Sequence, residues 1–478
     1  MKKTGLFKIL MFTLLSMVVI TWIFSASYYS EGTIELLGMY NLGFFDFFQL
    51  LFSSFEFAYF IQIFILLVSI GALYGVMEKT GRYRSLVEKI ANNLNGTELI
   101  FLLLTAFVIA TLSSLFDYGF ALFIFIPFII SIILAMGYDK ITACVATFGS
   151  MLIGTVGSTL GYNTTNVINS MLELANKDVI IYKIALFVLS IILLFIYLSR
   201  AKIDKKGNKN SEETMFLGEK VNKEKSGTPI IVIFSILFVL LVLGCTSWVN
   251  TFEVDLFTNI HSAITEFSFK MPYFHVTAEG LEYGMEEVAL FQKIIGTINP
   301  FGEWYYAEMA VMCLIASGIL GLCCCKHETG EAMAEGAKKM IKPGFLVMLA
   351  YCVIYFVGNT MFFTTIAELL LSITDKFNIF FSTIVMILGS ALHVDVLYLA
   401  NYLVPQVAGT GAESAVVAIL TQGIYGVTML IAPTSAVLIL GLTYLNISFK
   451  EWVKGIWKFV LALLAIVIIV TLIAMLII

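Results

Sequence analysis

Two acidic residues lie inside long apolar stretches of this sequence, where a charge is costly. Asp117 is followed ten residues later by Pro127, and Asp395 is followed ten residues later by Pro405. A carboxylate at membrane depth holds a proton, lies beside a cation or caps a helix end. We therefore expect both acids to bind a proton, another cation or the cationic part of a small molecule. The alternative is that they cap half-helices at the tips of hairpins.

One histidine accompanies the second acid. His393 lies two residues before Asp395 and is the only histidine in the apolar part of the chain. It is a candidate proton relay, although a single histidine among apolar residues also serves as a packing residue. Glu368 and Glu413 are lesser candidates for the same chemistry.

A G-x-x-G pair and a group of hydroxyl or amide residues follow each acid along the chain. Where a helix breaks, its unpaired N–H groups suit an anion, whereas freed carbonyl and hydroxyl oxygens suit a hard cation such as Na⁺. Small and hydroxyl residues also serve close helix packing in membranes, which is the alternative explanation. The predicted substrate-binding residues are Ser158, Asn163, Thr164, Thr165, Asn166, Gln422, Thr428, Thr434 and Ser435, with Pro433 beside the last two. The predicted coupling-ion residues are Gly157, Asp117, Asp395, His393 and Gly426.

The acid, the proline and the G-x-x-G pair recur in the same order in two regions, 98–176 and 377–446. Irregular backbone at membrane depth is tolerated only where protein or a water-filled cavity satisfies its polar groups. Interrupted apolar segments in corresponding positions of two halves indicate a transporter binding site. We therefore predict two inverted repeats, each with a re-entrant hairpin and a broken helix.

The composition indicates whether these regions lie in water or in a lipid bilayer. Of the 478 residues, 60% are hydrophobic and only 13% are charged, and the mean hydropathy is +0.96. Soluble globular proteins carry about 25% charged residues. The chain is therefore expected to be an all-α polytopic membrane protein. The seven cysteines form no C-x-x-C pair, so neither a disulfide framework nor a metal site is expected beyond a bound Na⁺.

Segments of about 20 apolar residues mark helices that cross a bilayer. Basic clusters between such segments indicate the cytoplasmic side, whereas the acidic segment 249–303 and the Phe-rich stretch 31–57 should face outward. We expect about eleven crossings of the cell (plasma) membrane, a cytoplasmic N-terminus and an outer C-terminus. The clear candidate spans are 7–27, 58–77, 180–199, 229–247, 304–325, 344–363 and 456–478.

These features divide the chain into five expected parts. The parts are 1–57, with the first transmembrane helix and an outer aromatic segment; 58–199, the first repeat; 200–228, a cytoplasmic basic linker; 229–343, scaffold helices with the outer acidic loop 249–303; and 344–478, the second repeat.

Several motifs resemble those of the YfcC-like carriers of the ion transporter superfamily, which carry C4-dicarboxylates or basic amino acids. The resemblance spans most of the chain and implies an elevator-type secondary transporter, often dimeric, that binds its substrate through 157–166 and 423–435. At the hairpin tips the sequence departs from the family pattern, so the resemblance does not imply a particular substrate. The residues that carry it are Gly137–Ala143, Gly154–Thr159, Ile431–Leu438 and Phe449–Trp452.

Taken together, these patterns predict a secondary active transporter of a small carboxylate-bearing metabolite, such as an amino acid or a dicarboxylate. It would be a symporter coupled to Na⁺ or H⁺, or an exchanger. The chain has no G-x-x-x-x-G-K-[ST] motif, and we expect neither an enzyme nor a cofactor. The expected partners are the substrate, the lipid bilayer and a second copy of the chain, and no nucleic acid. The alternatives are a channel for ions or small solutes and, less favoured, an intramembrane enzyme.

Overall fold

The computed structural model describes residues 5–30, 32–203, 214–218, 225–278, 280–294 and 296–478. Most of these residues are helical, and only two short β-hairpins interrupt the helical architecture. The expected linker 200–228 lies partly outside the described residues. Three further residues used in the sequence analysis, Lys2, Lys3 and Glu279, also lie outside the described residues.

The part of the chain before residue 200 begins with one helix and one hairpin and continues with helices. Its elements are α1 (Leu6–Thr21), β1 (Ala26–Ser30), β2 (Thr33–Gly38), α2 (Phe44–Phe55), α3 (Ala58–Thr80), α4 (Arg82–Asn93), α5 (Glu98–Phe116), η1 (Gly119–Ile124), α6 (Ile126–Ala135), α7 (Lys140–Cys144), η2 (Val145–Gly149), α8 (Ser150–Val156), η3 (Tyr162–Asn166), α9 (Val167–Met171) and α10 (Asn176–Leu198).

The part after residue 227 contains the second hairpin and the remaining helices. Its elements are α12 (Thr228–Cys245), α13 (Trp248–Phe252), α14 (Leu256–Thr265), β3 (Ser268–Thr277), β4 (Gly280–Ala289), α15 (Leu290–Ile294), α16 (Tyr306–Cys324), η4 (Lys326–Glu328), α17 (Thr329–Thr360), α18 (Phe362–Leu371), α19 (Ile379–His393), α20 (Val396–Tyr402), α21 (Val404–Ala408), α22 (Ser414–Met429), α23 (Ala436–Tyr444) and α24 (Phe449–Ile477).

Seven helical segments among the described residues are long and apolar enough to cross a membrane. Six of the seven predicted spans fall on α3, α10, α12, α16, α17 and α24. The seventh long segment is α5, which the sequence placed inside an interrupted region and which is continuous up to its end at Phe116. The total of eleven crossings stays a prediction.

The predicted span 7–27 is wrong at its end, because α1 stops at Thr21. The chain then turns into strand β1, where the N–H of Ser27 donates to the Met361 carbonyl at 3.3 Å. The hydroxyls of Ser27 and Thr365 are also hydrogen-bonded, at 2.8 Å. These contacts with the start of α18 hold the segment as a strand.

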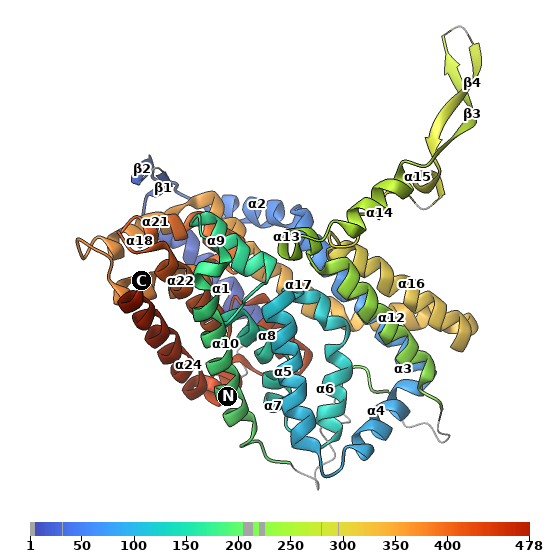
Figure 1. Ribbon diagram of the computed structural model, residues 1–478, viewed down its shortest axis with the longest axis horizontal. Coiled ribbons are helices and arrows are strands. Elements are labelled where there is room, and N and C mark those ends of the chain that lie inside the picture. The colour runs from blue at the N-terminus through green and yellow to red at the C-terminus, as the bar shows by residue number, and fades with distance from the viewer. Residues whose placement is uncertain (1–4, 31, 204–213, 219–224, 279, 295) are drawn as a thin grey trace.

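The segment 249–303, predicted to be an outer loop, contains α13, α14, a β-hairpin and α15. In the hairpin, Lys270 lies opposite Glu287, and Phe274 lies opposite Tyr283 with ring centroids 5.5 Å apart. Cross-strand pairs of opposite charge and of aromatic rings stabilise antiparallel strands. Figure 1 shows this hairpin projecting from the helical body, on the same side as β1, β2 and α2 and away from α4.

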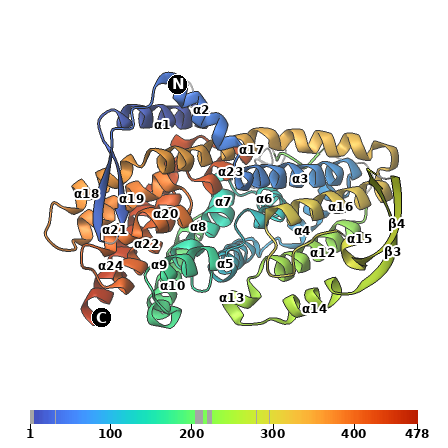
Figure 2. The same cartoon turned by 90° about the horizontal axis from the view of Figure 1, so that it is seen from above.

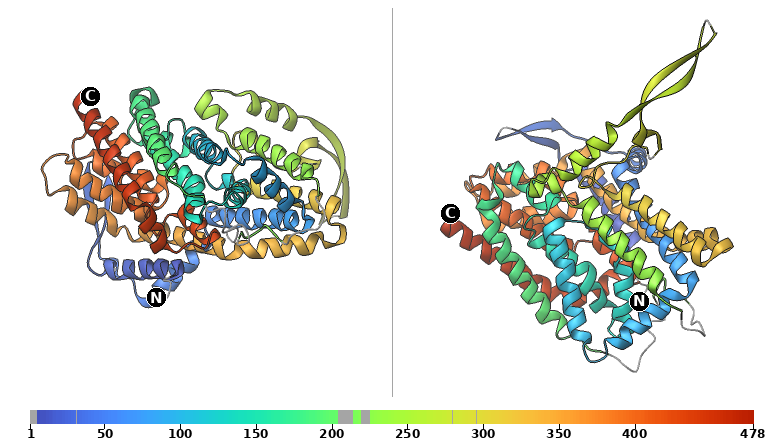
Figure 3. Two further views of the ribbon diagram at one scale, coloured as in Figure 1. Left: turned by 90° about the horizontal axis from the view of Figure 1, so that it is seen from below. Right: turned by 45° about the vertical axis from the view of Figure 1, so that its right-hand side comes forward.

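Helix α3 lies between α16 and α17 in one layer of the molecule (Figure 2). The approach is close, because a side-chain carbon at Gly75 would meet the backbone of Ala332 and Gly336 on α17. Small residues at such crossings allow helix backbones to pack tightly in membranes. On the other side, α10 and α24 run side by side (Figure 3), with α8 and α22 packed against them.

Both interrupted regions contain helices that end inside apolar stretches of the sequence. In the first, α5 ends at Asp117, and the α7–α8 helix ends before the non-helical segment 157–161. In the second, α19 ends before Asp395, and α22 ends before the non-helical segment 430–435. The breaks follow the order that the sequence markers predicted. The relation of the two halves as inverted repeats stays a prediction.

Candidate substrate-binding site

The carboxylate of Asp117 joins the two breaks of the first region. Asp117 has a φ angle of +56°, which ends α5 and turns the chain away from the helix axis. Its Oδ2 atom accepts a hydrogen bond of 2.6 Å from the hydroxyl of Thr164. Because Thr164 lies in η3, directly after the broken helix, this bond ties the end of α5 to the segment with the predicted half-site.

The carboxylate of Asp395 has two different partners. Its Oδ1 atom accepts the N–H of Leu397 at 2.9 Å and thereby caps the start of α20. Its Oδ2 atom accepts the hydroxyl of Tyr59 on α3 at 3.4 Å. The capping role predicted as an alternative is therefore present. The second oxygen connects the same carboxylate to α3, in a different layer of the molecule.

Both acids line one cavity of about 530 Å³ between α3, α16 and α17 on one side and the helix breaks on the other. Asn163 and Thr164 line it as well, so four of the predicted site residues meet there. None of the described residues that line this cavity is a lysine, an arginine or a histidine. The cavity therefore presents carboxylate, hydroxyl and amide oxygens and no side chain with a positive charge.

Comparison with known proteins places the chain in a family. The family model described as "DcuC: C4-dicarboxylate anaerobic carrier" matches residues 4–476. The chain belongs to the DcuC family. No curated protein sequence matches this family member significantly.

Two solved transporter structures cover almost all of this DcuC-family chain. The YdaH transporter of Alcanivorax borkumensis is 13% identical, with a TM-score of 0.43, and the match covers 97% of each chain. MtrF of Neisseria gonorrhoeae, from a class of antimetabolite efflux pumps, is 10% identical with a TM-score of 0.40. That match covers 98% of this chain and 95% of MtrF.

Three residues predicted to bind substrate lie behind the cavity wall instead. The side-chain amide of Gln422 donates to the Ser158 carbonyl at 2.7 Å. The Thr165 hydroxyl donates to the same carbonyl at 2.8 Å and to Gln422 Oε1 at 3.3 Å. Ser158, Thr165 and Gln422 are all buried. Since Gln422 belongs to α22, this network connects α22 of the second interrupted region to the non-helical segment 157–161 of the first.

The second predicted half-site is also occupied by protein contacts. The Thr434 hydroxyl donates to the Ala391 carbonyl at 2.5 Å, and the Ser435 hydroxyl accepts the N–H of Leu438 at the start of α23. The Thr428 hydroxyl is buried without a hydrogen-bond partner among the described residues. Asn166 lies at the end of η3 and does not line the cavity.

The two glycines and the histidine predicted to bind the coupling ion are in contact with other parts of the protein. A side-chain carbon at Gly157 would meet the backbone of Phe187, and one at Gly426 would meet Val156. Both glycines therefore permit close helix packing. His393 is buried, with Nδ1 2.9 Å from the Gly389 carbonyl and its ring stacked near Tyr402, and it does not line the cavity.

Five tyrosines of the cavity wall were missed by sequence reasoning. Tyr59, Tyr306 and Tyr351 form a cluster of rings, with the Tyr59 centroid 5.9 Å from that of Tyr306 and 5.8 Å from that of Tyr351. Tyr305 and Tyr398 line the same cavity. A tyrosine in an apolar helix usually has a partner for its hydroxyl. Among the 21 tyrosines of the chain, however, a single one gives little signal.

A buried lysine behind the first break was also missed. Lys183, on α10, has no exposed surface, and its ammonium donates to the Asn169 side chain at 3.0 Å. The amide of Asn169 donates to Asn176 Oδ1 at 3.4 Å, and Asn176 donates to the Thr159 carbonyl at 3.1 Å. This chain of contacts holds α9 and the break against α10. A lysine inside the apolar run 180–199 was the available signal.

Proposed function

We propose that this DcuC-family protein is a secondary active carrier of a small carboxylate-bearing metabolite, and that Asp117 and Asp395 bind the coupling cations. The observation that supports this most is the pair of carboxylates in one cavity without a basic side chain among the described lining residues. The cavity also lies where helices of both interrupted regions break, which is typical of secondary transporters.

Electrostatics favours ion coupling over uptake of the substrate alone. A dicarboxylate in this cavity would lie beside two further carboxylates, and like charges repel strongly where water is scarce. Such a substrate binds well only when protons or metal cations neutralise the acids. Oxygen donors from a carboxylate, the Thr164 hydroxyl and the Asn163 amide suit Na⁺, and a carboxylate alone suits a proton.

C4-dicarboxylates are the first substrate candidates, since the family description names them. Amino acids are the second, and the absence of a basic side chain among the described lining residues favours them. An amino acid brings its own ammonium group, which could pair with one of the two acids. The two candidates differ in a measurable way, because only the dicarboxylate requires every compensating cation to come from solution.

The finer features predicted from the sequence belong to this proposal. They are the YfcC-like relationship, the inverted repeats, an elevator-type movement, a homodimer and a plasma-membrane location with the N-terminus inside and the C-terminus outside. The position of β1, β2, α2 and the β3–β4 hairpin on one side of the molecule supports the proposed orientation (Figure 1). These segments include the stretches whose composition predicts an outer location.

Uptake into liposomes tests the proposal. Purified protein should accumulate radiolabelled succinate or aspartate against its gradient when an inward Na⁺ or proton gradient is imposed, or exchange it for internal substrate. Asp117→Asn, inserted equally well, should abolish the dependence on the ion. Passive equilibration that responds to neither a trans ion nor a trans substrate would contradict the carrier and favour the channel.

A further inference from the structure

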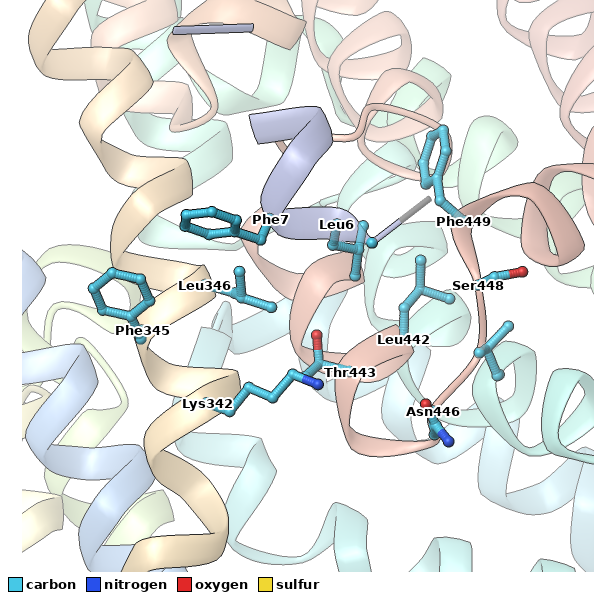
Figure 4. Close-up of a pocket in the computed structure, with 12 residues that line it drawn as sticks. Leu6, Phe7, Lys342, Phe345, Leu346, Leu442, Thr443, Asn446, Ser448 and Phe449 are labelled. Carbon is cyan, nitrogen blue, oxygen red and sulfur yellow. The ribbon is translucent and has the colours of Figure 1, made fainter. Parts of the chain in front are cut away.

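A second cavity lies between the first turn of α1, the middle of α17 and the link from α23 to α24. It has a volume of about 380 Å³. Figure 4 shows Lys342 extending from α17 toward Thr443 on α23, with Leu6, Phe7 and Leu346 beside them. The cavity therefore combines a cationic side chain with an apolar wall.

Three polar side chains of this cavity lack protein partners among the described residues. The Thr443 hydroxyl is buried without a hydrogen bond to any described residue. Within the described part of the chain, Lys342 makes no ion pair, and the side chain of Asn446 makes no hydrogen bond. A buried hydroxyl without a partner costs about 1–3 kcal/mol. Three donor groups without a protein acceptor border this one cavity, and such a set fits a bound anion.

The apolar wall indicates which kind of anion. Phe7 is 49% exposed and Phe345 is 41% exposed, and both border the cavity. In a membrane protein such side chains contact acyl chains. The link to α24 also begins a basic stretch with Lys450, Lys454 and Lys458. Basic residues gather at the level of anionic headgroups. A free phosphate ion would use the lysine but would gain nothing from the aromatic wall.

We propose that this cavity binds one anionic phospholipid. The Lys342 ammonium pairs with the phosphate, the Thr443 hydroxyl and the Asn446 amide donate to it, and the acyl chains lie against Phe7 and Phe345. The lipid contacts α1 and α17 on one side and the α23–α24 link on the other, so it joins elements that are distant in the sequence. This site is separate from the cavity of Asp117 and Asp395 and does not depend on what the carrier transports.

Native mass spectrometry of the purified full-length protein tests the proposal, with phosphatidylglycerol and phosphatidylcholine as probes. The wild type should retain one phosphatidylglycerol more tightly than phosphatidylcholine. Lys342→Gln should weaken that binding about five-fold, the effect of losing one lysine at an anionic surface. Lys338→Gln is the matched control, because Lys338 is exposed one turn earlier on α17 and does not line the cavity. It should bind as the wild type does.

Thr443→Val provides a second, independent measurement. Removing a hydroxyl without a protein partner should leave thermal stability in lipid-free detergent equal or higher, while phosphatidylglycerol binding weakens. Equal binding of the two lipids, or equal losses in Lys342→Gln and Lys338→Gln, would overturn the proposal. A gain in thermal stability with inorganic phosphate equal to the gain with the lipid would also overturn it, since the cavity would then be a site for a soluble anion.

Discussion

Thr164 and Asp117 are hydrogen-bonded at 2.6 Å, although 47 residues separate them in the sequence. The bond connects the end of α5 to the residues that follow the broken helix α8. Both side chains also line the cavity. In the proposed carrier, a cation bound to the Asp117 carboxylate would also change the contact that positions the polar segment 162–166, and ion binding would thereby prepare the site for substrate.

Thr164→Val should reduce transport about tenfold or more. The substitution keeps the shape of the side chain and removes a hydrogen bond to a charged group, which contributes about 1.5–3 kcal/mol. Initial uptake rates in proteoliposomes at several Na⁺ concentrations and pH values measure it, and the ion dependence should shift with the rate. Thr147→Val is the control, because the Thr147 hydroxyl bonds only to a carbonyl of its own helix. Equal rates in the two variants would contradict this role of Thr164.

Substitutions of Asp395 should separate its capping role from ion binding. Asparagine caps a helix about as well as aspartate, whereas alanine does not and costs about 1 kcal/mol. Asp395→Asn should therefore keep the thermal stability of the wild type and lose ion-dependent uptake, and Asp395→Ala should lose both. Asp139 is the matched control, since it caps α7 through the Thr142 N–H at 2.6 Å and lies outside the cavity. Asp139→Asn should transport normally. Normal ion-dependent uptake by Asp395→Asn would mean that Asp395 only caps α20 and does not bind the ion.

The sequence singled out the two acids, which the structure places on one cavity, because a carboxylate in an apolar stretch is rare enough to stand out. It could not distinguish Asn163, which lines the cavity, from Thr434, which bonds to the Ala391 carbonyl. Both are polar residues beside a predicted break. Which way each one points depends on where the helix resumes, and a pattern of residue types does not contain that information.

The tyrosines escaped prediction for a different reason. The chain contains 21 tyrosines and 41 phenylalanines, so a single tyrosine in an apolar helix carries little signal. Tyr59, Tyr306 and Tyr351 become a group only because α3 packs between α16 and α17. Their common role depends on contacts between segments that are hundreds of residues apart. The spans themselves were predictable, since their length and apolarity are local properties.

Gln422→Leu should slow transport and lower stability, with little effect on substrate affinity. Gln422 is buried and bridges α22 to the first break, so its loss leaves the Ser158 carbonyl with fewer donors. The expected cost is about 1–3 kcal/mol. Thermal denaturation in detergent and the KM and maximal rate of uptake measure the two effects. Gln406→Leu removes another buried glutamine, which donates to the Thr364 carbonyl away from the break, and should lower stability without slowing transport. A raised KM in Gln422→Leu would instead indicate direct contact with substrate.

Lys183 and Asn169 should behave as a coupled pair in a double-mutant cycle. Asn169→Leu leaves the buried ammonium without its acceptor, which should cost about 1.5–3 kcal/mol, the contribution of a hydrogen bond to a charged group. Lys183→Met removes that charge and should cost less. The double variant should therefore be more stable than Asn169→Leu alone, as measured by unfolding of the purified protein in mixed micelles. Effects that add within about 0.5 kcal/mol would mean that the two residues act independently. Lys183→Arg should keep the charge but fail to restore wild-type stability, because the larger guanidinium needs more acceptors than this buried position offers.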